Sequence, residues 1–257
     1  MKIFLTNDDG IFSKGLKALY KQFSLRHSVT VVAPDRERSA VGQGITLHEP
    51  LRATMVEIHG GFLGYAVNGT PTDCIKLGVL EILDSKPDVV ISGINPGPNV
   101  GVNIHYSGTV AAAKEAALYG IPAIAVSVQS EGTGHYDDVA TFIETLTEEV
   151  LKQGLPFGTC LNVNIPNISI KESAGIRYSR QGIELFSEYF DKRIDPRNRT
   201  YYWQGCDSQV MDNSPDIDGV ALCDNYITIT PLKCDMTDYS MMEELKGWDL
   251  HRAGLKD

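Results

Sequence analysis

Two adjacent carboxylates, Asp8 and Asp9, stand near the start of the chain and are followed by Gly10. Like charges this close repel each other unless a cation lies beside them. Carboxylate oxygens are the ligands that hard divalent cations prefer. The pair directly follows the apolar run 2–6, where a first strand would end. The alternative is an ordinary turn, because Asp and Gly are common turn residues.

Two further polar segments also follow apolar runs. Segment 34–42 contains Ser39, whose hydroxyl could reach a metal or a phosphate, although its mixed charges also fit a solvated loop. Segment 92–103 is dense in Gly and Asn, which allow unusual backbone angles and close approach to a ligand. Asn95 and Asn99 in this segment offer amide oxygens as ligands and amide groups as donors.

A helix start adds a possible anion site. Ser107, Gly108 and Thr109 open an Ala-rich segment that predicts a helix over 107–119. Free backbone N–H groups at a helix start bind anions, helped by the helix dipole. The alternative is an ordinary Ser or Thr N-cap. Because segment 92–103 lies just before it, we expect Asn99, Ser107, Gly108 and Thr109 to contact a phosphate group.

Apolar strands and amphipathic helices alternate through the first two thirds of the chain, which is typical of a mostly parallel sheet covered on both faces. We therefore predict an α/β fold with a doubly wound, Rossmann-like, three-layer arrangement, whose ligand sites lie beyond the carboxyl ends of the strands. The predicted strands are 2–6, 28–33, 51–58, 62–68, 88–92, 122–127 and 160–165, with a hairpin turn at 60–61. The first predicted helix is capped by Ser13 and carries Leu16, Leu19, Tyr20 and Phe23 on one face. The others are 72–83 with Thr72 as its cap, 107–119 and 136–153.

The pattern changes after residue 170. Strands are predicted at 175–180, 200–204 and 226–230 and a helix at 238–247, separated by polar stretches at 183–199 and 206–224. We divide the chain into an α/β core, 1–170, that carries the site, and a C-terminal extended arm or hairpin, 171–257, that is no independent domain. Such an arm serves oligomerisation or is a simple surface excursion.

Composition excludes several classes of protein. The formal net charge of −10 and the absence of a basic run disfavour binding to a nucleic-acid duplex. The five cysteines are odd in number and form no C-x-x-C pair, so we expect reduced thiols rather than disulfides or a zinc site. No signal peptide or apolar run of about 18 residues is visible, so we expect a cytoplasmic protein with no membrane partner.

Taken together, these segments resemble the SurE survival proteins, which are metal-dependent 5'- and 3'-nucleotidases. The resemblance covers nearly the whole chain in the same order. The segments that carry it are 6–10, 32–40, 68–74, 92–99, 106–113, 120–127 and 226–232.

The resemblance implies that Asp8, Asp9, Ser39 and Asn95 hold one divalent cation, Mg²⁺ or Mn²⁺, in each subunit. It implies a 5'-nucleotidase that hydrolyses nucleoside 5'-monophosphates, and also 3'-monophosphates and short polyphosphate. It further implies a homodimer or homotetramer built through the C-terminal arm. A metal-bound water would attack the phosphate, and Asp8 or Asp9 would accept its proton.

Two other functions stay open at this point. Asp8 could instead form an aspartyl-phosphate, as in haloacid-dehalogenase-like phosphatases. Those enzymes use two Asp residues separated by one position, whereas adjacent side chains point to opposite sides of an extended segment. The second alternative is a non-catalytic nucleotide-binding or sensor module, which would not need paired acids beside a phosphate.

Overall fold

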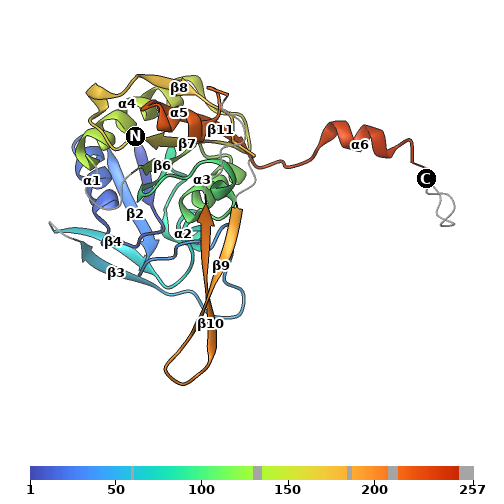
Figure 1. Ribbon diagram of the computed structural model, residues 1–257. Helices are drawn as coiled ribbons and strands as arrows, with labels where there is room; N and C mark the ends of the chain where they lie inside the picture. The colour runs from blue at the N-terminus through green and yellow to red at the C-terminus, as the bar shows by residue number, and fades with distance from the viewer. Residues whose placement is uncertain (59–60, 130–134, 184–186, 208–213, 249–257) are drawn as a thin grey trace.

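A nine-stranded sheet forms the centre of the computed structural model, which describes all residues except 59–60, 130–134, 184–186, 208–213 and 249–257 (Figure 1). The strand order across the sheet is β3-β4-β2-β1-β5-β6-β7-β11-β8. The strands are β1 (Lys2–Thr6), β2 (Ser28–Pro34), β3 (Ala53–Ile58), β4 (Phe62–Val67), β5 (Val89–Pro96), β6 (Ala123–Val128), β7 (Thr159–Ile165), β8 (Ile176–Tyr178) and β11 (Ile227–Lys233).

The order of the strands creates a switch point in the middle of the sheet. Strands β4, β2, β1, β5, β6 and β7 run parallel, while β3 and β11 are antiparallel to their neighbours β4 and β7. The chain leaves β1 toward β2 on one side and later returns to the other side of β1 as β5. Ligand sites form where the connections diverge in this way, beyond the carboxyl ends of the strands.

Helices cover both faces of the sheet. The helices α1 (Lys14–Phe23) and α4 (Tyr136–Gln153) pack together on one face, and α2 (Pro71–Leu77) and α3 (Gly108–Leu118) pack together on the other. Because the central strands are buried on both sides, all six residues of β6 are buried. The predicted three-layer α/β class is confirmed by this architecture.

The start of α2 differs from the prediction. Thr72 is not the cap, because the cap is Thr70, whose hydroxyl accepts a hydrogen bond from Asp73 N. The Asp73 carboxylate in turn accepts a bond from Thr70 N at 2.9 Å, so the two residues form a capping box around Pro71. Beyond Leu77 the chain continues as a π-helical turn over Gly78–Ile82.

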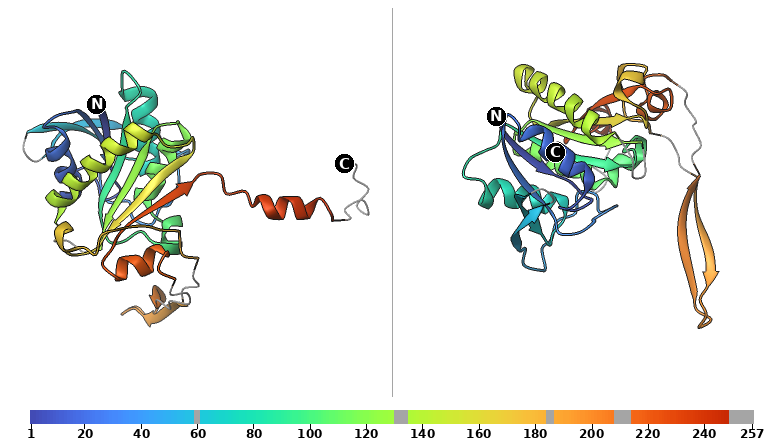
Figure 2. Two further views of the ribbon diagram at one scale, coloured as in Figure 1. Left: turned by 90° about the horizontal axis from the view of Figure 1, so that it is seen from above. Right: turned by 90° about the vertical axis from the view of Figure 1, so that its left-hand side faces the viewer.

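The C-terminal third contributes two strands to the central sheet and also contains segments that lie outside it. Strands β8 and β11 join the nine-stranded sheet, and the short helix α5 (Asp218–Cys223) lies beside them. Strands β9 (Ser187–Ile194) and β10 (Thr200–Asp207) form a separate antiparallel hairpin, and α6 (Tyr239–Leu245) ends an extended segment. Both pieces project from the body of the protein (Figures 1 and 2).

The sequence predicted β10 and α6 but missed β9 and α5. Strand β9 mixes charged residues with aromatic ones, so it shows neither a clean alternation nor an apolar run. Helix α5 has only six residues, which is too short for a periodic pattern. Gly60 of the predicted hairpin turn, and residues 184–186, 208–213 and 249–257 of the predicted arm, lie outside the described residues.

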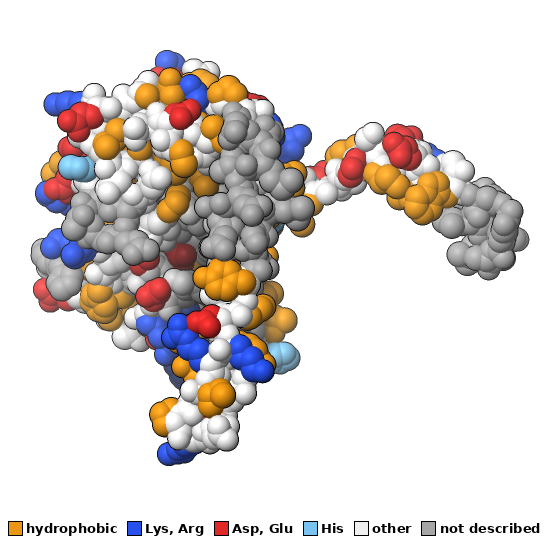
Figure 3. Space-filling model, viewed as in Figure 1, with side chains coloured by type: hydrophobic (Ala, Val, Ile, Leu, Met, Phe, Trp, Pro, Cys, Tyr) orange, Lys and Arg blue, Asp and Glu red, His pale blue; other side chains and the backbone are white. Residues whose placement is uncertain are grey.

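The projecting hairpin carries large apolar side chains that face solvent (Figure 3). Burying them against another surface would be favourable, because apolar area removed from water stabilises by roughly 25 cal/mol per Å². In the part of the chain that is described, no helix has the length and apolar character needed to cross a bilayer. The exposed side chains of the hairpin are Tyr189, Phe190, Ile194, Tyr201, Tyr202 and Trp203.

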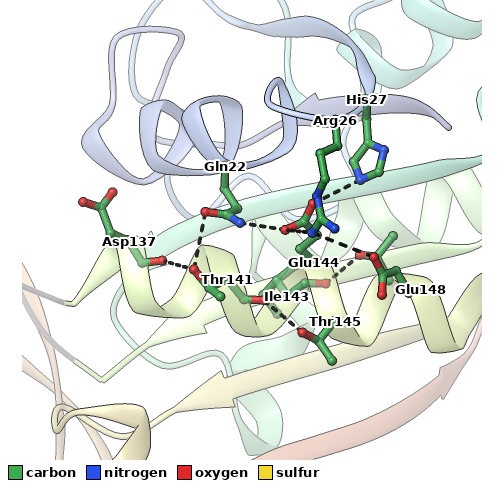
Figure 4. Close-up of polar contacts among 10 residues, drawn as sticks. Gln22, Arg26, His27, Asp137, Thr141, Ile143, Glu144, Thr145 and Glu148 are labelled. Atoms are coloured by element: carbon green, nitrogen blue, oxygen red, sulfur yellow. Dashed lines mark hydrogen bonds and ion pairs between the residues drawn. The ribbon is translucent and has the colours of Figure 1, made fainter.

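A buried carboxylate joins α4 to the end of α1 (Figure 4). Glu144 accepts hydrogen bonds from Gln22 Nε2 at 2.6 Å and forms an ion pair with Arg26 Nη2 at 2.9 Å. His27 Nε2 lies 3.1 Å from the other carboxylate oxygen. Burial alone would raise the pKa of Glu144, but the bonds from Gln22, Arg26 and His27 outweigh it and lower the pKa below the ordinary value.

We predict that Glu144→Ala lowers the free energy of unfolding by about 1 to 3 kcal/mol, because it leaves the partner groups without their acceptor. A lowered pKa in the folded state stabilises above the ordinary value of 4.5 and is lost as pH falls through the folded pKa. The difference between wild type and variant, measured by urea unfolding, should therefore be full at neutral pH and shrink in acid.

The exposed Glu148 on the same helix provides the control, and Glu148→Ala should change stability by less than about 0.5 kcal/mol. Equal losses in the two variants would contradict the assigned role of Glu144.

Candidate metal and phosphate site

The turn after β1 is closed by the side chain of Asn7. Its Nδ2 donates to Gly10 O at 3.0 Å and to Ser13 Oγ at 2.6 Å. Gly10 adopts φ +97°, a conformation that favours glycine. The backbone N–H of Ile11 donates to Pro34 O at 2.8 Å, which ties the turn to the end of β2. These bonds fix Asp8 and Asp9 at the carboxyl end of β1.

The start of α3 lies directly against Asp8. Thr109 Oγ1 donates to Asp8 Oδ1 at 2.5 Å, and Asp8 is only 6% exposed. The approach is so close at Gly108 that a Cβ there would lie 2.8 Å from Asp8 Cβ and 3.0 Å from Asp8 Oδ2. Only glycine fits this position without displacement. The paired acids and the helix start therefore form a single site.

Burial makes the two acids unusual. It raises the pKa of Asp8, although hydrogen bonds from Thr109 oppose the shift. Burial also raises the pKa of Asp9 to about 8, and the negative charges of Asp8 and Glu37 add to the effect. Among the described residues, Asp9 Oδ2 and Asn7 Oδ1 are buried side-chain oxygens with no hydrogen-bond partner. Desolvated, mutually repelling oxygens of this kind fit a hard divalent cation.

Asn95 lies on the strand beside β1. Thr6, the last residue of β1, pairs with Ser92 of β5, so Asp8, Asp9 and Asn95 all follow this last pair of the two strands. The sequence predicted that this strand ends at Ser92, whereas β5 continues past an irregularity to Pro96 and pairs Asn95 with Ser127 of β6. Asn95 Nδ2 donates to Gly97 O at 2.7 Å, so its amide oxygen is the atom left for a cation.

Ser39 is exposed, and its hydroxyl donates to Glu37 Oε1 at 2.6 Å. The preceding residue is fixed against the acids, because Arg38 N donates to Asp8 O at 2.7 Å. A hydroxyl whose proton is directed to Glu37 keeps its lone pairs for a metal. Sequence reasoning treated Glu37 only as one of several loop charges, yet it acts on the pKa of both acids.

The predicted phosphate contacts meet partners that the sequence did not reveal. Ser107 Oγ accepts a hydrogen bond from Val110 N at 3.1 Å, and Ser107 N donates to Asn103 O at 3.2 Å. Thr109 is directed at Asp8 through its hydroxyl and its backbone. Gly108 N, by contrast, has no hydrogen-bond acceptor within the described part of the chain, which leaves it able to donate to a phosphate oxygen. The phosphate roles of Ser107 and Thr109 stay predictions.

Asn99 is hydrogen-bonded to the sheet beneath the loop and does not point outward. Asn99 Nδ2 donates to Ser127 Oγ at 2.8 Å, and Asn99 N donates to Asn164 Oδ1 at 2.7 Å. Asn99 O accepts from Nδ2 of both Asn162 and Asn164, at 2.8 and 3.1 Å. With these groups engaged, Asn99 shapes the turn that carries Asn95. Its contact with phosphate also stays a prediction.

A doubly wound sheet with desolvated acids and a helix start at its switch point defines a phosphate-handling α/β protein. Comparison with known proteins narrows this class. Residues 3–188 match the family model described as "Survival protein SurE". The chain therefore belongs to the SurE family.

Individual relatives match along nearly their full length. The protein named "5'-nucleotidase SurE" from Desulfatibacillum aliphaticivorans is 56% identical over 98% of this chain and 100% of its own. The protein of the same name from Syntrophobacter fumaroxidans is 47% identical over 97% of this chain and 100% of its own. The crystal structure of the SurE protein from Aquifex aeolicus superposes with a TM-score of 0.83 at 40% identity, over 96% of this chain and 98% of that one.

The raised pKa of Asp9 predicts that the metal-free protein loses stability as pH rises. A group whose pKa is higher in the folded state stabilises below its ordinary value, here 3.8, and that contribution is lost as pH rises through the folded value of about 8. The slope is at most about 1.4 kcal/mol per pH unit for one proton. Thermal unfolding in EDTA between about pH 5 and pH 8 measures it.

Mn²⁺ or Mg²⁺ should oppose this loss, and the increase in melting temperature on adding metal should grow with pH. Asp9→Asn is the matched control, because its amide does not titrate and its metal-free melting curve should vary less with pH. A wild-type protein in EDTA that gains stability over the same range would contradict the prediction.

Proposed function

We propose that this protein is a metal-dependent phosphatase that hydrolyses nucleoside 5'-monophosphates. The observation that carries the proposal is the contact of Gly108 with Asp8, which brings an anion-binding helix start against a pair of cation-binding acids. Neither half would suffice alone, since the acids repel a phosphate and the helix start by itself does no chemistry. The relatives named 5'-nucleotidase support the choice of substrate.

One divalent cation per subunit, Mg²⁺ or Mn²⁺, would be held by Asp8, Asp9, Asn95 and Ser39. The oxygen-only donor set and the buried, partnerless Asp9 Oδ2 support this assignment. When bound, such a cation supplies Lewis acidity to the phosphoryl group and to an attacking water. Among the described residues, no group of three or more His, Cys, Asp or Glu side chains could hold a metal ion. The two acids therefore need the neutral oxygens as further ligands.

The chain's own residues orient the reaction. Gly108 N and the dipole of α3 attract the phosphate oxygens, while Thr109 holds Asp8 in one orientation. Asp9 Oδ2 accepts the proton of the attacking water as its oxygen bonds to phosphorus. The ester bond to the ribose oxygen breaks, and that oxygen takes a proton from solvent water as the nucleoside leaves, while Asp9 returns its proton to the solvent.

The two alternatives are less well supported. A covalent aspartyl-phosphate would need Asp8 to approach phosphorus, yet Asp8 is buried and already accepts from Thr109. A binding module or sensor would have no use for two desolvated acids next to the phosphate. Trapping of a phospho-enzyme would favour the covalent route, and metal-independent binding without turnover would favour the module.

We predict that EDTA abolishes phosphate release from AMP and that Mn²⁺ or Mg²⁺ restores it. Asp9→Asn should lower kcat by at least about 100-fold, because it removes a metal ligand and the proton acceptor while keeping the side-chain volume. Phosphate release and circular dichroism measure activity and fold.

Asp137→Asn, at an exposed position on α4, is the control and should retain wild-type kcat. Full activity of Asp9→Asn, or equal turnover with and without EDTA, would remove the basis of the proposal. The same assay with 3'-monophosphates and short polyphosphate decides whether these are further substrates.

We propose that the core, 1–170, carries the site and that the C-terminal arm, 171–257, builds a homodimer or homotetramer. The exposed apolar side chains of the β9–β10 hairpin and of α6, which include Trp203 and Met242, support this role. We also propose a cytoplasmic location. The described cysteines Cys74, Cys160, Cys223 and Cys234 are all free thiols, which supports a reducing compartment.

We predict that Tyr201→Ser combined with Trp203→Ser shifts the protein to a smaller assembly. The two side chains share one face of β10, and their loss would remove much of its apolar area. Light scattering after size-exclusion chromatography measures the mass. Phe157→Ser, at an even more exposed aromatic of the core, is the control and should leave the mass unchanged. A wild-type protein that is monomeric would overturn the oligomer proposal.

A further inference from the structure

The proposed reaction leaves one buried carboxylate unexplained. Asp218, the first residue of α5, is 0% exposed although it lies in the C-terminal third of the chain. Its Oδ2 accepts from Gly101 N at 2.9 Å. Its Oδ1 accepts from Gly182 N at 3.1 Å and from Gly219 N at 2.8 Å. A carboxylate kept out of water by three backbone donors holds those donors firmly, since bonds to a charged acceptor are stronger than neutral ones.

The hydrogen bond from Gly101 to Asp218 lies in the turn that connects two parts of the site. Gly101 begins a short 3₁₀ helix, Gly101–His105, that leads to Ser107 and the start of α3. On its other side, the turn leads back to Asn95. The turn contains Gly97 at φ +116° and Gly101 at φ +59°, backbone conformations that glycine adopts far more readily than other residues. Fixing Gly101 therefore fixes the spacing between the proposed metal ligand Asn95 and the helix start.

A second set of bonds holds the opposite side of the same turn. Asn164 both accepts from Asn99 N and donates to Asn99 O, and Asn164 is fully buried in β7. The turn is thus held between the sheet beneath it and Asp218 beside it. Val100 also lies close to α5, since a Cβ at Gly219 would be 3.7 Å from Val100 Cγ2.

The same carboxylate also holds the root of the projecting hairpin. Gly182 lies a few residues before β9, and Gln181 Nε2 donates to Gly101 O at 2.9 Å. The site turn and the segment that leads into the hairpin therefore share Asp218 as a common acceptor and are bonded to each other directly.

We infer that Asp218 is a positioning residue for the phosphatase reaction, which holds the 95–103 turn in register with the start of α3 and with the root of the hairpin. The inference rests on the proposed function, because it assigns a role within the same site. Asp218 is neither one of the proposed cation ligands nor one of the predicted phosphate contacts. Its effect is on orientation, to which reaction rates are sensitive even when binding is not.

The test compares Asp218→Asn with Asp216→Asn in the full-length protein. Asparagine keeps the volume of Asp218, but it retains one acceptor oxygen and directs an NH₂ group at a backbone N–H. For Asp218→Asn we expect kcat for AMP to fall about 10- to 100-fold, with KM and the Kd for Mn²⁺ changed by less than about threefold. Steady-state kinetics and calorimetric titration with Mn²⁺ provide these values.

Asp216 is an exposed neighbour that pairs with Arg180, so Asp216→Asn should leave kcat and KM unchanged. A wild-type kcat in a folded Asp218→Asn variant would overturn the inference. A loss confined to KM or to Mn²⁺ binding would also overturn it. Failure of wild type to hydrolyse AMP in any metal would instead reject the proposed function, so the two failures are distinguishable.

Hydrogen exchange in the wild-type protein tests the same inference should Asp218→Asn fail to fold. The amides of Gly101 and Gly182 share one acceptor, so the segments 97–105 and 180–183 should be protected to a similar degree and open together. Rapid exchange at Gly101 while Gly182 stays protected would show that Asp218 does not hold the turn.

Discussion

The enclosure of two neighbouring carboxyl groups, those of Asp8 and Asp9, is the constraint on which the site depends. Removing a carboxylate from water is costly, and placing a second beside it adds repulsion, which is why the pKa of Asp9 lies at about 8. The fold maintains this arrangement through Asn7, which closes the turn, and Thr109, which holds Asp8. The loss of folding stability that this arrangement causes creates a site where binding of a cation is strongly favoured.

The strand order of the sheet determines where such a cation site can form. Because β1 lies between β2 and β5, the connections on its two sides diverge, and the space beyond β1 is open to loops from both halves. Gly108 then allows α3 to approach Asp8 within contact distance. The candidate site of this chain therefore depends on the strand order and on one glycine as well as on the identity of the proposed ligands.

Sequence reasoning recovered what depends on local pattern. Strand β1 and helix α4 were predicted with their exact bounds, and Ser13 was correctly predicted to cap α1, because apolar periodicity and capping chemistry are local signals. The cap of α2 was misplaced from Thr70 to Thr72, since the capping box at Asp73 was not recognised. Strand β9 was missed because its pairing with β10, rather than its own composition, makes it a strand.

The residues that support the site were not predictable in the same way. Glu37, Asn164 and Asp218 act through contacts across long stretches of sequence or through proximity that only the fold creates. Asp218 and Gly101 are 117 positions apart, and nothing in either local sequence indicates that they meet. Polar residues at the ends of apolar runs indicated where the candidate ligands lie, and the resemblance to the SurE family supplied the set of four.

The distance along the chain between Asp218 and the site also bears on the order of synthesis. The proposed ligands and the start of α3 all precede residue 119, and the asparagines of β7 precede residue 166. Asp218 leaves the ribosome after all of them. A growing chain thus contains the residues proposed to bind the cation well before the residue that we infer to fix their alignment.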